Sequence, residues 1–177
     1  MNDKQKTRRL FFALWPTDQV RQSMVELLTS LPQKKNGRVM RPSNLHVTLH
    51  FIGQATTSTK DCMHAAARSV QAEPFQIDLN CFGLFPKAKI LWMGTRNPSA
   101  QLEQLHKKLG LAIEDCGFNS DTRVFSPHVT LARKYTGPVP ERVSFSIPWA
   151  IEEFVLVESV PFEQGVNYQV IEKYPLA

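Results

Sequence analysis

Cysteine is scarce in this sequence, and long hydrophobic runs are absent. The three cysteines, Cys62, Cys81 and Cys116, lie far apart and form no CxxC pair, a pattern that argues against a zinc site and indicates a reducing compartment. Near the N-terminus the apolar run Leu10–Trp15 stops at Pro16, which makes it too short for a signal peptide. No stretch approaches the length of a membrane span. We therefore expect a cytoplasmic protein that does not associate with membranes.

The composition shows neither the low hydrophobicity of a disordered chain nor a large excess of one charge. The 177 residues are 42% hydrophobic and 21% charged, as in ordinary globular domains. A chain of this length can bury roughly 70% of its unfolded surface, so it needs no disulfide or structural metal to hold together. The net charge of +5 favours anionic partners only weakly.

One basic stretch is more informative than the net charge. Lys34, Lys35, Arg38 and Arg41 cluster in a Pro/Gly-containing segment that leads into the first motif described below. A solvated loop is the alternative interpretation. Because of its position next to the motif, we expect this stretch to face phosphate groups.

Hydrophobic periodicity predicts strands and helices that alternate along the chain. Short apolar or alternating runs predict strands at residues 10–15, 46–52, 75–81, 89–93, 128–132, 151–160 and 166–174, the last two joined by a hairpin turn near Gln164. Apolar residues at helical spacing predict helices that begin near Asp18, Thr59 and Asn97, the first of which ends before Pro32.

The order strand, helix, loop, histidine strand occurs twice, which indicates an internal duplication of a half-domain rather than a repeat array. We expect an α+β fold in which residues 1–177 form a single domain with two similar lobes. Each lobe is expected to be a small sheet covered by helices, with a ligand cleft between the lobes.

A four-residue motif, His-Val-Thr-Leu, occurs at His46–Leu49 and again at His128–Leu131, about 80 residues later. Chance would produce such a repeat among the five histidines with a probability on the order of two in a thousand. Side chains alternate between the two faces of a strand, so each copy directs its histidine and threonine to one face and its aliphatic residues to the other. A half-buried strand whose polar face merely meets solvent is the alternative, and the matched pair disfavours it.

A metal site is the second alternative, because His46 and His50 have the spacing of zinc-binding helices. Val47 follows His46 where the HExxH pattern requires glutamate. On a strand that rises ~3.3 Å per residue, positions 46 and 50 stand roughly 13 Å apart. Two imidazoles on one zinc need bonds of about 2 Å each. We therefore expect no metal and no cofactor at this motif.

Paired histidines and hydroxyls suit the cleavage of a phosphodiester. In-line attack at phosphorus needs a base for the entering oxygen and an acid for the leaving oxygen, on opposite sides. Histidine serves both roles because its pKa of about 6.5 makes both forms available near neutrality. Threonine hydroxyls can donate hydrogen bonds to the non-bridging oxygens.

With these motifs, the sequence resembles the two-histidine (2H) phosphoesterases, and within them the RNA 2′,3′-cyclic phosphodiesterases, also called 2′-5′ RNA ligases. Three further segments support this resemblance: Arg9–Ala13, Asn44-Leu45-His46 and Ser126-Pro127-His128. The similarity extends over nearly the whole chain. It implies a bilobal α+β fold, with two pseudo-symmetric lobes of mainly antiparallel sheet and helices and the active site in the cleft between them.

The resemblance also implies an activity and roles for five residues. Family members hydrolyse a terminal 2′,3′-cyclic phosphate on RNA to a 2′-phosphate without a metal. His46 corresponds to the proton donor to the leaving 3′ oxygen and His128 to the proton acceptor that activates water. Thr48, Thr130 and Arg133 correspond to substrate-binding positions. The expected partner is RNA with a cyclic phosphate end, tRNA fragments being one candidate, and no obligate protein partner is expected.

Two other functions remain open at this point: a ligase or nuclease acting on 2′-5′ bonds, and an RNA-end binding module without catalysis. Outside the motifs, alternation places His50 on the cleft face, in a supporting or solvated role. Helical spacing places His64 and His106 on solvated faces. We expect three aromatic residues in the core: Trp15, Phe51 and Trp92.

Overall fold

The computed structural model describes residues 7–31, 37–119, 124–163 and 165–177. Lys34, Lys35, Pro32 and Gln164, for which we made predictions above, lie outside these ranges. The described elements are, in chain order, β1 (Arg8–Leu14), α1 (Asp18–Ser30), β2 (Arg38–Val39), the 3₁₀ turn η1 (Pro42–Asn44), β3 (Val47–Ala55), α2 (Thr57–Arg68), β4 (Phe75–Leu79), β5 (Cys81–Phe85), β6 (Ile90–Gly94), α3 (Ala100–Glu114), β7 (His128–Arg133), β8 (Ile147–Ile151), β9 (Glu153–Phe162) and β10 (Gly165–Pro175).

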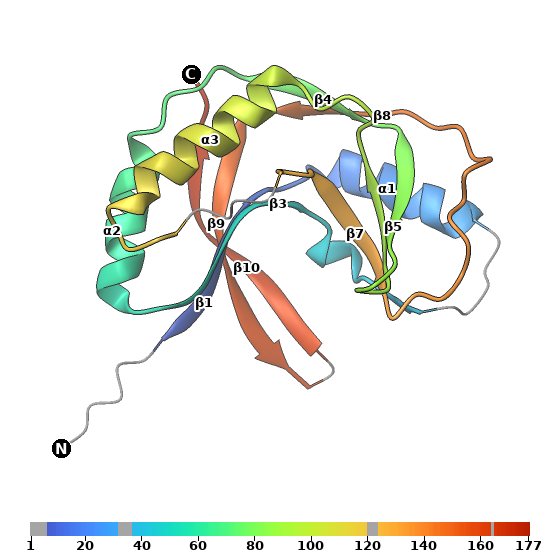
Figure 1. Ribbon diagram of the computed structural model, residues 1–177, viewed down its shortest axis with the longest axis horizontal. Coiled ribbons are helices and arrows are strands. Elements are labelled where there is room, and N and C mark those ends of the chain that lie inside the picture. Colours follow the sequence, from blue (N-terminus) through green and yellow to red (C-terminus); the bar gives the residue numbers. More distant parts are fainter. Residues whose placement is uncertain (1–6, 32–36, 120–123, 164) are drawn as a thin grey trace.

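The main sheet consists of two halves that meet at the two motif strands. Its strand order is β10-β9-β1-β3-β7-β6-β5, with β2 paired to β7, and its strand pairs are antiparallel. β3 and β7 are joined through one residue pair, Val47 and Val129. The sheet is bent into an arch at this point (Figure 1). A separate two-stranded ribbon contains β4 and β8. The predicted bilobal α+β fold is confirmed.

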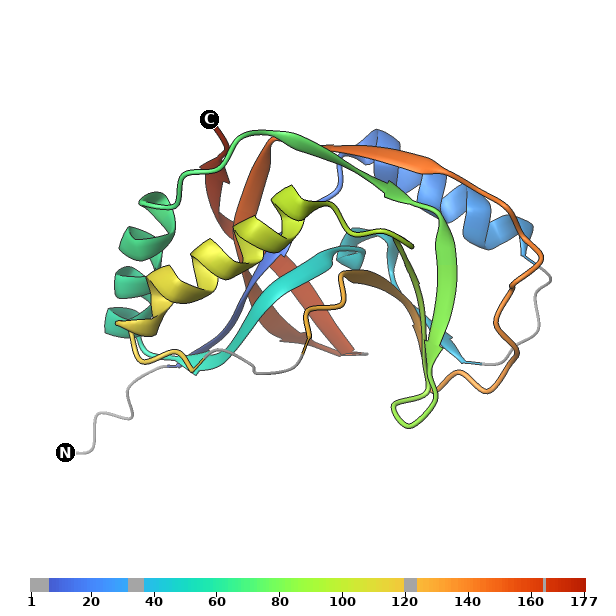
Figure 2. The same cartoon turned by 45° about the horizontal axis from the view of Figure 1, so that its top comes forward.

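The helices cross over between the two halves. α1 follows β1 in the sequence, yet it contacts β8 and lies on the side of the molecule that holds β5 and β7 (Figures 1 and 2). α3 connects β6 to β7, yet it contacts α2, β3 and β4. α1 thus leads from β1 in one half to β2, which pairs with β7 in the other half, and α3 packs against β3 although it connects two strands of the β7 half. This exchange supports our proposal that residues 1–177 form one domain.

The three predicted helices are present and begin near the predicted residues, whereas the strands β2, β5 and β8 were missed. The Thr17 hydroxyl accepts a hydrogen bond from the Val20 amide at the start of α1, and the Ser99 hydroxyl accepts one from the Leu102 amide at the start of α3. β8 was not predicted. It contains Pro148, which interrupts the strand pattern and is tolerated because β8 pairs with one neighbour only. No helix of the described ranges is long and apolar enough to cross a membrane.

An irregularity in β3 decides which of its side chains face the cleft. Along the pairing with β1, the partner of Phe12 is His50 and the partner of Ala13 is Thr48, so Leu49 is an extra residue. Leu49 and His50 are consequently both buried, at 4% and 5% exposure, and Phe51 is 51% exposed. Strict alternation therefore holds up to Thr48 and fails after it.

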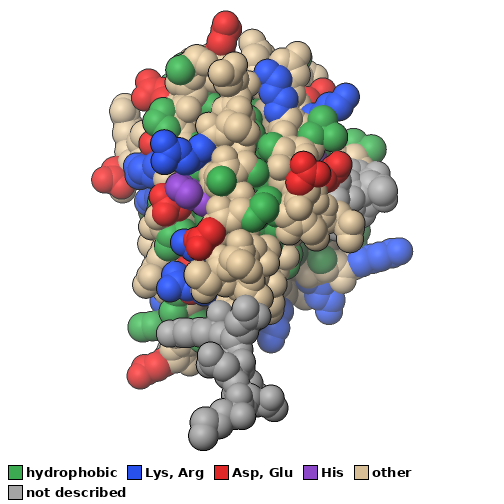
Figure 3. Space-filling view, turned by 90° about the vertical axis from the view of Figure 1, so that its left-hand side faces the viewer, with side chains coloured by type: hydrophobic (Ala, Val, Ile, Leu, Met, Phe, Trp, Pro, Cys, Tyr) green, Lys and Arg blue, Asp and Glu red, His purple; other side chains and the backbone are tan. Residues whose placement is uncertain are grey.

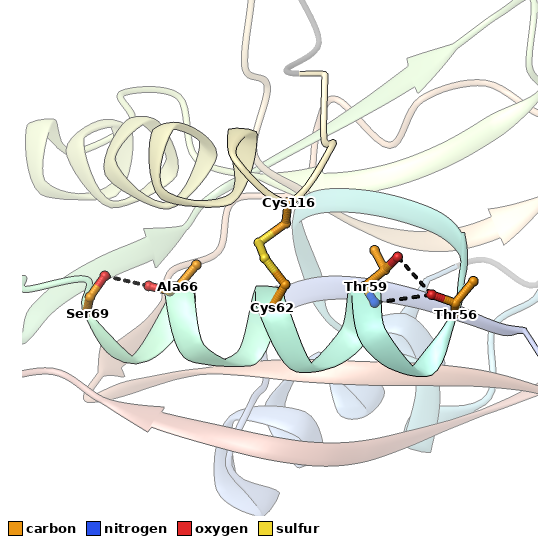
Figure 4. The surroundings of a disulfide bond; sticks show 6 residues. All are labelled: Thr56, Thr59, Cys62, Ala66, Ser69 and Cys116. Carbon is orange, nitrogen blue, oxygen red and sulfur yellow. Dashed lines mark hydrogen bonds between the residues drawn. A yellow bond between two sulfur atoms is a disulfide. The ribbon is translucent and has the colours of Figure 1, made fainter.

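A disulfide joins Cys62 on α2 to Cys116, just past the end of α3 (Figure 4). The spacing of the cysteines did not indicate this cross-link. Cys81 is the free cysteine. The disulfide fixes the two helices to each other over the same half of the sheet.

Reducing this disulfide is expected to lower the stability of the fold. In the chain-entropy model, a cross-link between cysteines 54 positions apart stabilises the folded state by about 4 kcal/mol. Urea unfolding of the oxidised protein, the dithiothreitol-treated protein and the Cys62→Ser/Cys116→Ser variant would measure this effect. Cys81→Ser is the matched control and should unfold like the oxidised protein. Equal urea midpoints for all forms would show that the cross-link does not stabilise the fold.

Candidate active site

A cleft of about 490 Å³ opens between the two halves of the sheet. Strands from both halves line it: β1, β3, β9 and β10 on one side, β6 and β7 on the other. The structure brings all five predicted site residues into this one cleft: His46, Thr48, His128, Thr130 and Arg133. The histidines meet here because β3 and β7 are adjacent in the sheet, even though the motifs are far apart in the chain.

Both histidines are held in the same way, by the carbonyl two residues before them. Nδ1 of His46 lies 2.7 Å from the Asn44 carbonyl oxygen, and Nδ1 of His128 lies 2.7 Å from the Ser126 carbonyl oxygen. A carbonyl only accepts, so Nδ1 carries the hydrogen in each ring. Nε2 is therefore the atom available for proton transfer. In His46 it lies 3.1 Å from the hydroxyl of Thr48.

Asn44 is a supporting residue whose role the sequence did not reveal. Its side chain is 4% exposed. It donates to the Val166 carbonyl and accepts from the Tyr168 amide, so it attaches the edge strand β10 to the segment that carries His46. Asn44 thus fixes one wall of the cleft and, through its own carbonyl, the orientation of the His46 ring.

Aromatic rings surround His46 on several sides. The Trp15 ring stacks on it at 5.7 Å, Phe11 lies at 4.9 Å, and Tyr168 meets it edge-on at 5.2 Å. The Arg21 guanidinium lies over the Trp15 ring, 5.7 Å from its centre. Trp15, which we expected in the core, is half-buried: it packs against the buried cluster that contains Phe11 and also stacks on His46.

The second histidine has an aromatic environment of its own. The Phe85 ring meets His128 edge-on at 4.9 Å, and the Trp92 ring lies at 6.1 Å. Trp92, which we expected in the core, pairs directly with Thr130 across the sheet and is half-buried. Its side chain therefore shares the cleft face with Thr130.

Burial keeps both catalytic candidates neutral in the ligand-free protein. Burial lowers the pKa of His46 to about 4, although the hydrogen bond to the Asn44 carbonyl raises it. The charges of Arg133 and Arg21, and that of His128 when it is protonated, lower this pKa further. Burial also lowers the pKa of His128, again with Arg133 contributing. A neutral His128 suits a base. His46 would need an anion in the cleft before it could act as an acid.

Phe51 was predicted to point into the core, and this prediction was wrong because of the extra residue in β3. Its ring lines the cleft, half exposed, and the Arg9 guanidinium lies 5.0 Å from its centre. An exposed aromatic ring at the edge of a cleft offers a face on which the planar ring of a ligand can stack.

His50 was predicted to face the cleft, and it faces the opposite side of the sheet. Its Nε2 donates a hydrogen bond of 2.7 Å to the carbonyl of His106, and the two rings stack at 4.1 Å. His106, predicted to be solvated, stacks in turn on Phe125 at 3.9 Å. His64 contacts the Tyr174 hydroxyl at 3.0 Å and is only partly exposed, away from the cleft.

Within the described ranges, no cluster of three or more His, Cys, Asp or Glu is placed to hold a metal.

A second cavity, of about 700 Å³, lies between α1 and β7. It is lined mainly by aliphatic and proline side chains, and Tyr135 is its one titratable group among the described residues. It therefore lacks the acid and base that bond cleavage requires.

Arg38 and Arg41 extend the positive charge beyond the cleft. Arg38 pairs with Arg133 between β2 and β7, so their side chains share a face. The Arg41 guanidinium lies 4.8 Å from the exposed ring of Phe162, in the β9–β10 hairpin. The face that carries α2 instead mixes basic and acidic side chains (Figure 3). Positive charge near the cleft therefore continues on its Arg38 side.

Comparison with known proteins gives a consistent result. The 2′-5′ RNA ligase superfamily matches residues 15–159. An RNA 2′,3′-cyclic phosphodiesterase of Thermus thermophilus is 30% identical over 179 residues, which cover 95% of this chain and 90% of the relative. One of Escherichia coli is 27% identical over 173 residues, which cover 96% of this chain and 97% of the relative.

Solved structures show the same fold over the whole length. E. coli LigT in its apo form has a TM-score of 0.86 and 27% identity, covering 97% of this chain and 98% of that chain. LigT complexed with 3′-AMP has a TM-score of 0.87 and 26% identity, covering 97% and 99%. The two-lobed fold is therefore shared with these structures.

Proposed function

Because this chain belongs to the 2′-5′ RNA ligase superfamily, we propose that it hydrolyses terminal 2′,3′-cyclic phosphates on RNA to 2′-phosphates. One observation carries this proposal: two His-x-Thr pairs and Arg133 line a single cleft, and each histidine has Nδ1 hydrogen-bonded so that Nε2 is the reactive atom. The names of the relatives support the same substrate.

The reaction needs a base that takes a proton from water and an acid that gives a proton to the leaving oxygen. Nε2 of neutral His128 accepts a proton from water, whose oxygen forms a bond to phosphorus. The bond from phosphorus to the 3′ oxygen breaks, and protonated His46 donates its proton to that oxygen. The product is a 2′-phosphate beside a free 3′ hydroxyl. One further proton transfer through solvent restores both histidines.

The negative charge of the substrate raises the pKa of His46, which is too low in the ligand-free protein for His46 to act as an acid. In the ligand-free protein the low pKa of His46, about 4, leaves it neutral. A cyclic phosphate carries a negative charge, which favours the imidazolium form and raises that pKa. Arg133 pairs with the non-bridging oxygens, and the hydroxyls of Thr48 and Thr130 donate to them. Binding therefore prepares the acid for its role.

The wider surface suits RNA rather than an isolated phosphate. Phe51 with Arg9 offers a stacking face for the terminal base. Arg38 and Arg41 extend the site towards preceding nucleotides. RNA fragments with cyclic ends, including tRNA fragments, are the substrates we propose, and the cytoplasm is where we expect the protein to meet them.

Hydrolysis is expected to persist in excess EDTA, because arginine and threonine side chains provide the electrostatic stabilisation that a metal would otherwise give. The assay is product formation from a short RNA with a 2′,3′-cyclic end, with and without the chelator. Activity that disappears with EDTA and returns with Mg²⁺ or Zn²⁺ would contradict the mechanism.

The same acid–base pair could run chemistry at 2′-5′ bonds, since making or cleaving such a bond also needs a base and an acid on opposite sides of phosphorus. A 2′-5′ dinucleotide assayed beside the cyclic-ended RNA separates the two activities. We expect the cyclic end to be the better substrate by kcat/KM. A higher kcat/KM for the dinucleotide would make the 2′-5′ bond the main target.

The basic stretch is expected to act on long substrates only. Neutralising it with Lys34→Gln, Lys35→Gln, Arg38→Gln and Arg41→Gln should weaken binding of a cyclic-ended oligonucleotide and leave a cyclic mononucleotide nearly unaffected. A plot of the logarithm of the binding constant against the logarithm of the salt concentration has a negative slope. This slope should become shallower by about 0.7 for every RNA phosphate that the variant no longer neutralises. Binding measured at several salt concentrations tests this, and equal effects on both substrates would support a solvated loop.

A further inference from the structure

The segment that leads into the second motif has no regular secondary structure, yet it sets the orientation of His128. Residues 124–127 lie outside the described helices and strands, and Val124 is 94% exposed. The carbonyl of Ser126, within this segment, accepts the hydrogen bond from Nδ1 of His128. A displacement of Ser126 would therefore rotate the ring or change which nitrogen carries the proton.

One side of Ser126 is anchored by close packing of backbone. Pro127 is buried, and its carbonyl oxygen lies only 2.9 Å from the position that a Cβ on Gly94 would occupy. The absence of a side chain at Gly94, which pairs with His128 between β6 and β7, permits this approach. This contact fixes the C-terminal end of the segment.

The other side of Ser126 is anchored by a stack of three rings. Phe125 stacks on His106 at 3.9 Å with an angle of 15° between the planes. His106 stacks on His50 at 4.1 Å, and the His50 ring donates to the His106 backbone carbonyl. His50 is 5% exposed and belongs to β3, the strand that carries Thr48 on its opposite face. The stack thus runs from the first motif strand through α3 to the residue before Ser126.

We propose that His50, His106 and Phe125 are positioning residues for His128. By holding Ser126 from the side opposite Pro127, the stack fixes the tautomer and the direction of the His128 ring. Because its inner member lies on the first motif strand, it also sets the placement of His128 relative to His46. This inference rests on the proposed function for its catalytic consequence, but the orientation of the His128 ring can be measured without turnover.

The test compares two replacements of the middle ring. His106→Phe keeps a flat ring for Phe125 and His50, and the backbone carbonyl that His50 uses is unchanged. His106→Leu has a similar volume and no ring to stack. Phe118→Leu is the matched control, because the Phe118 ring lies 5.4 Å from the His50 ring at an angle of 78° and is not a member of the stack that leads to Ser126. Phe125→Leu serves as a second disrupting variant if His106→Leu does not fold.

Two readouts are needed: NMR of the His128 imidazole nitrogens across pH, and kcat and KM for a cyclic-ended RNA. In His106→Leu we expect a mixture of tautomers, a lower His128 pKa because the hydrogen bond to its charged form is weakened, and kcat reduced by about tenfold with KM nearly unchanged. His106→Phe and Phe118→Leu should behave like the parent protein in both readouts.

The proposal is overturned if His106→Leu, or Phe125→Leu in its place, leaves the His128 tautomer and pKa unchanged. It is also overturned if His106→Phe is as impaired as His106→Leu. If the parent protein does not hydrolyse the cyclic end, the proposed function fails. The NMR comparison still decides whether the stack positions His128.

Discussion

Replacing His46 or His128 by alanine is expected to lower kcat for cyclic phosphate hydrolysis by roughly 10²–10⁴, the usual contribution of a general acid or base. Binding should change much less, because Arg133 and the two threonines remain. Steady-state kinetics on a cyclic-ended RNA measure both effects, with circular dichroism to establish that the variants fold. His64→Ala is the matched control, since His64 lies outside the cleft.

The two alanine variants are expected to differ in how a better leaving group rescues them. A cyclic aryl phosphate expels a phenol, which is far more acidic than a ribose hydroxyl and needs little protonation. If His46 is the proton donor, this substrate should restore much of the activity of His46→Ala and little of that of His128→Ala. Rescue of His128→Ala instead would reverse the two roles. Near-normal turnover of cyclic-ended RNA by either folded variant would contradict the mechanism.

Removing the arginine beside the second motif should have the next largest effect. Arg133→Ala is expected to lower kcat/KM by about 10²–10³, as the removal of one stabilising donor does in other enzymes. Arg133→Lys keeps the charge but not the two-pronged hydrogen bonding, so it should restore only part of the activity. Arg142→Ala, on an exposed loop, is the control.

Arg133→Ala is also expected to change how kcat/KM depends on pH. Burial is the main cause of the low pKa of His128, and the positive charge of Arg133 lowers it further. Without that charge the pKa rises, so His128 remains protonated up to a higher pH. The acid limb of the kcat/KM profile should therefore move to higher pH. A limb that stays in place with unchanged kcat/KM would remove Arg133 from the site.

The sequence predicted the placement of the motif side chains well where local rules are sufficient. Alternation along a strand places His46 with Thr48, and His128 with Thr130, on one face, and the structure confirms both pairs. The rule fails at Leu49, because the pairing of β3 with β1 inserts an extra residue there. The register depends on how two strands pair, so the sequence of β3 alone did not reveal that Phe51 lines the cleft.

Other features depend on contacts between segments that are distant in the chain. Cys62 and Cys116 are joined because α3 crosses to the half of the sheet that α2 covers. His106 looked solvated on its own helix and is instead held between His50 and Phe125. Helical spacing specifies which residues share a face of one helix, and tertiary packing decides what that face meets.

In the mechanism that we propose, water activated by one histidine opens the cyclic phosphate at its 3′ bond while the other histidine protonates the leaving oxygen. Single-turnover hydrolysis of a 2′,3′-cyclic-ended RNA in ¹⁸O-labelled water with EDTA tests it most directly, with the product resolved by ³¹P NMR. We predict a 2′-phosphate that contains the label, formed far more slowly by His46→Ala and by His128→Ala. A 3′-phosphate, or a 2′-phosphate without the label, would contradict the account.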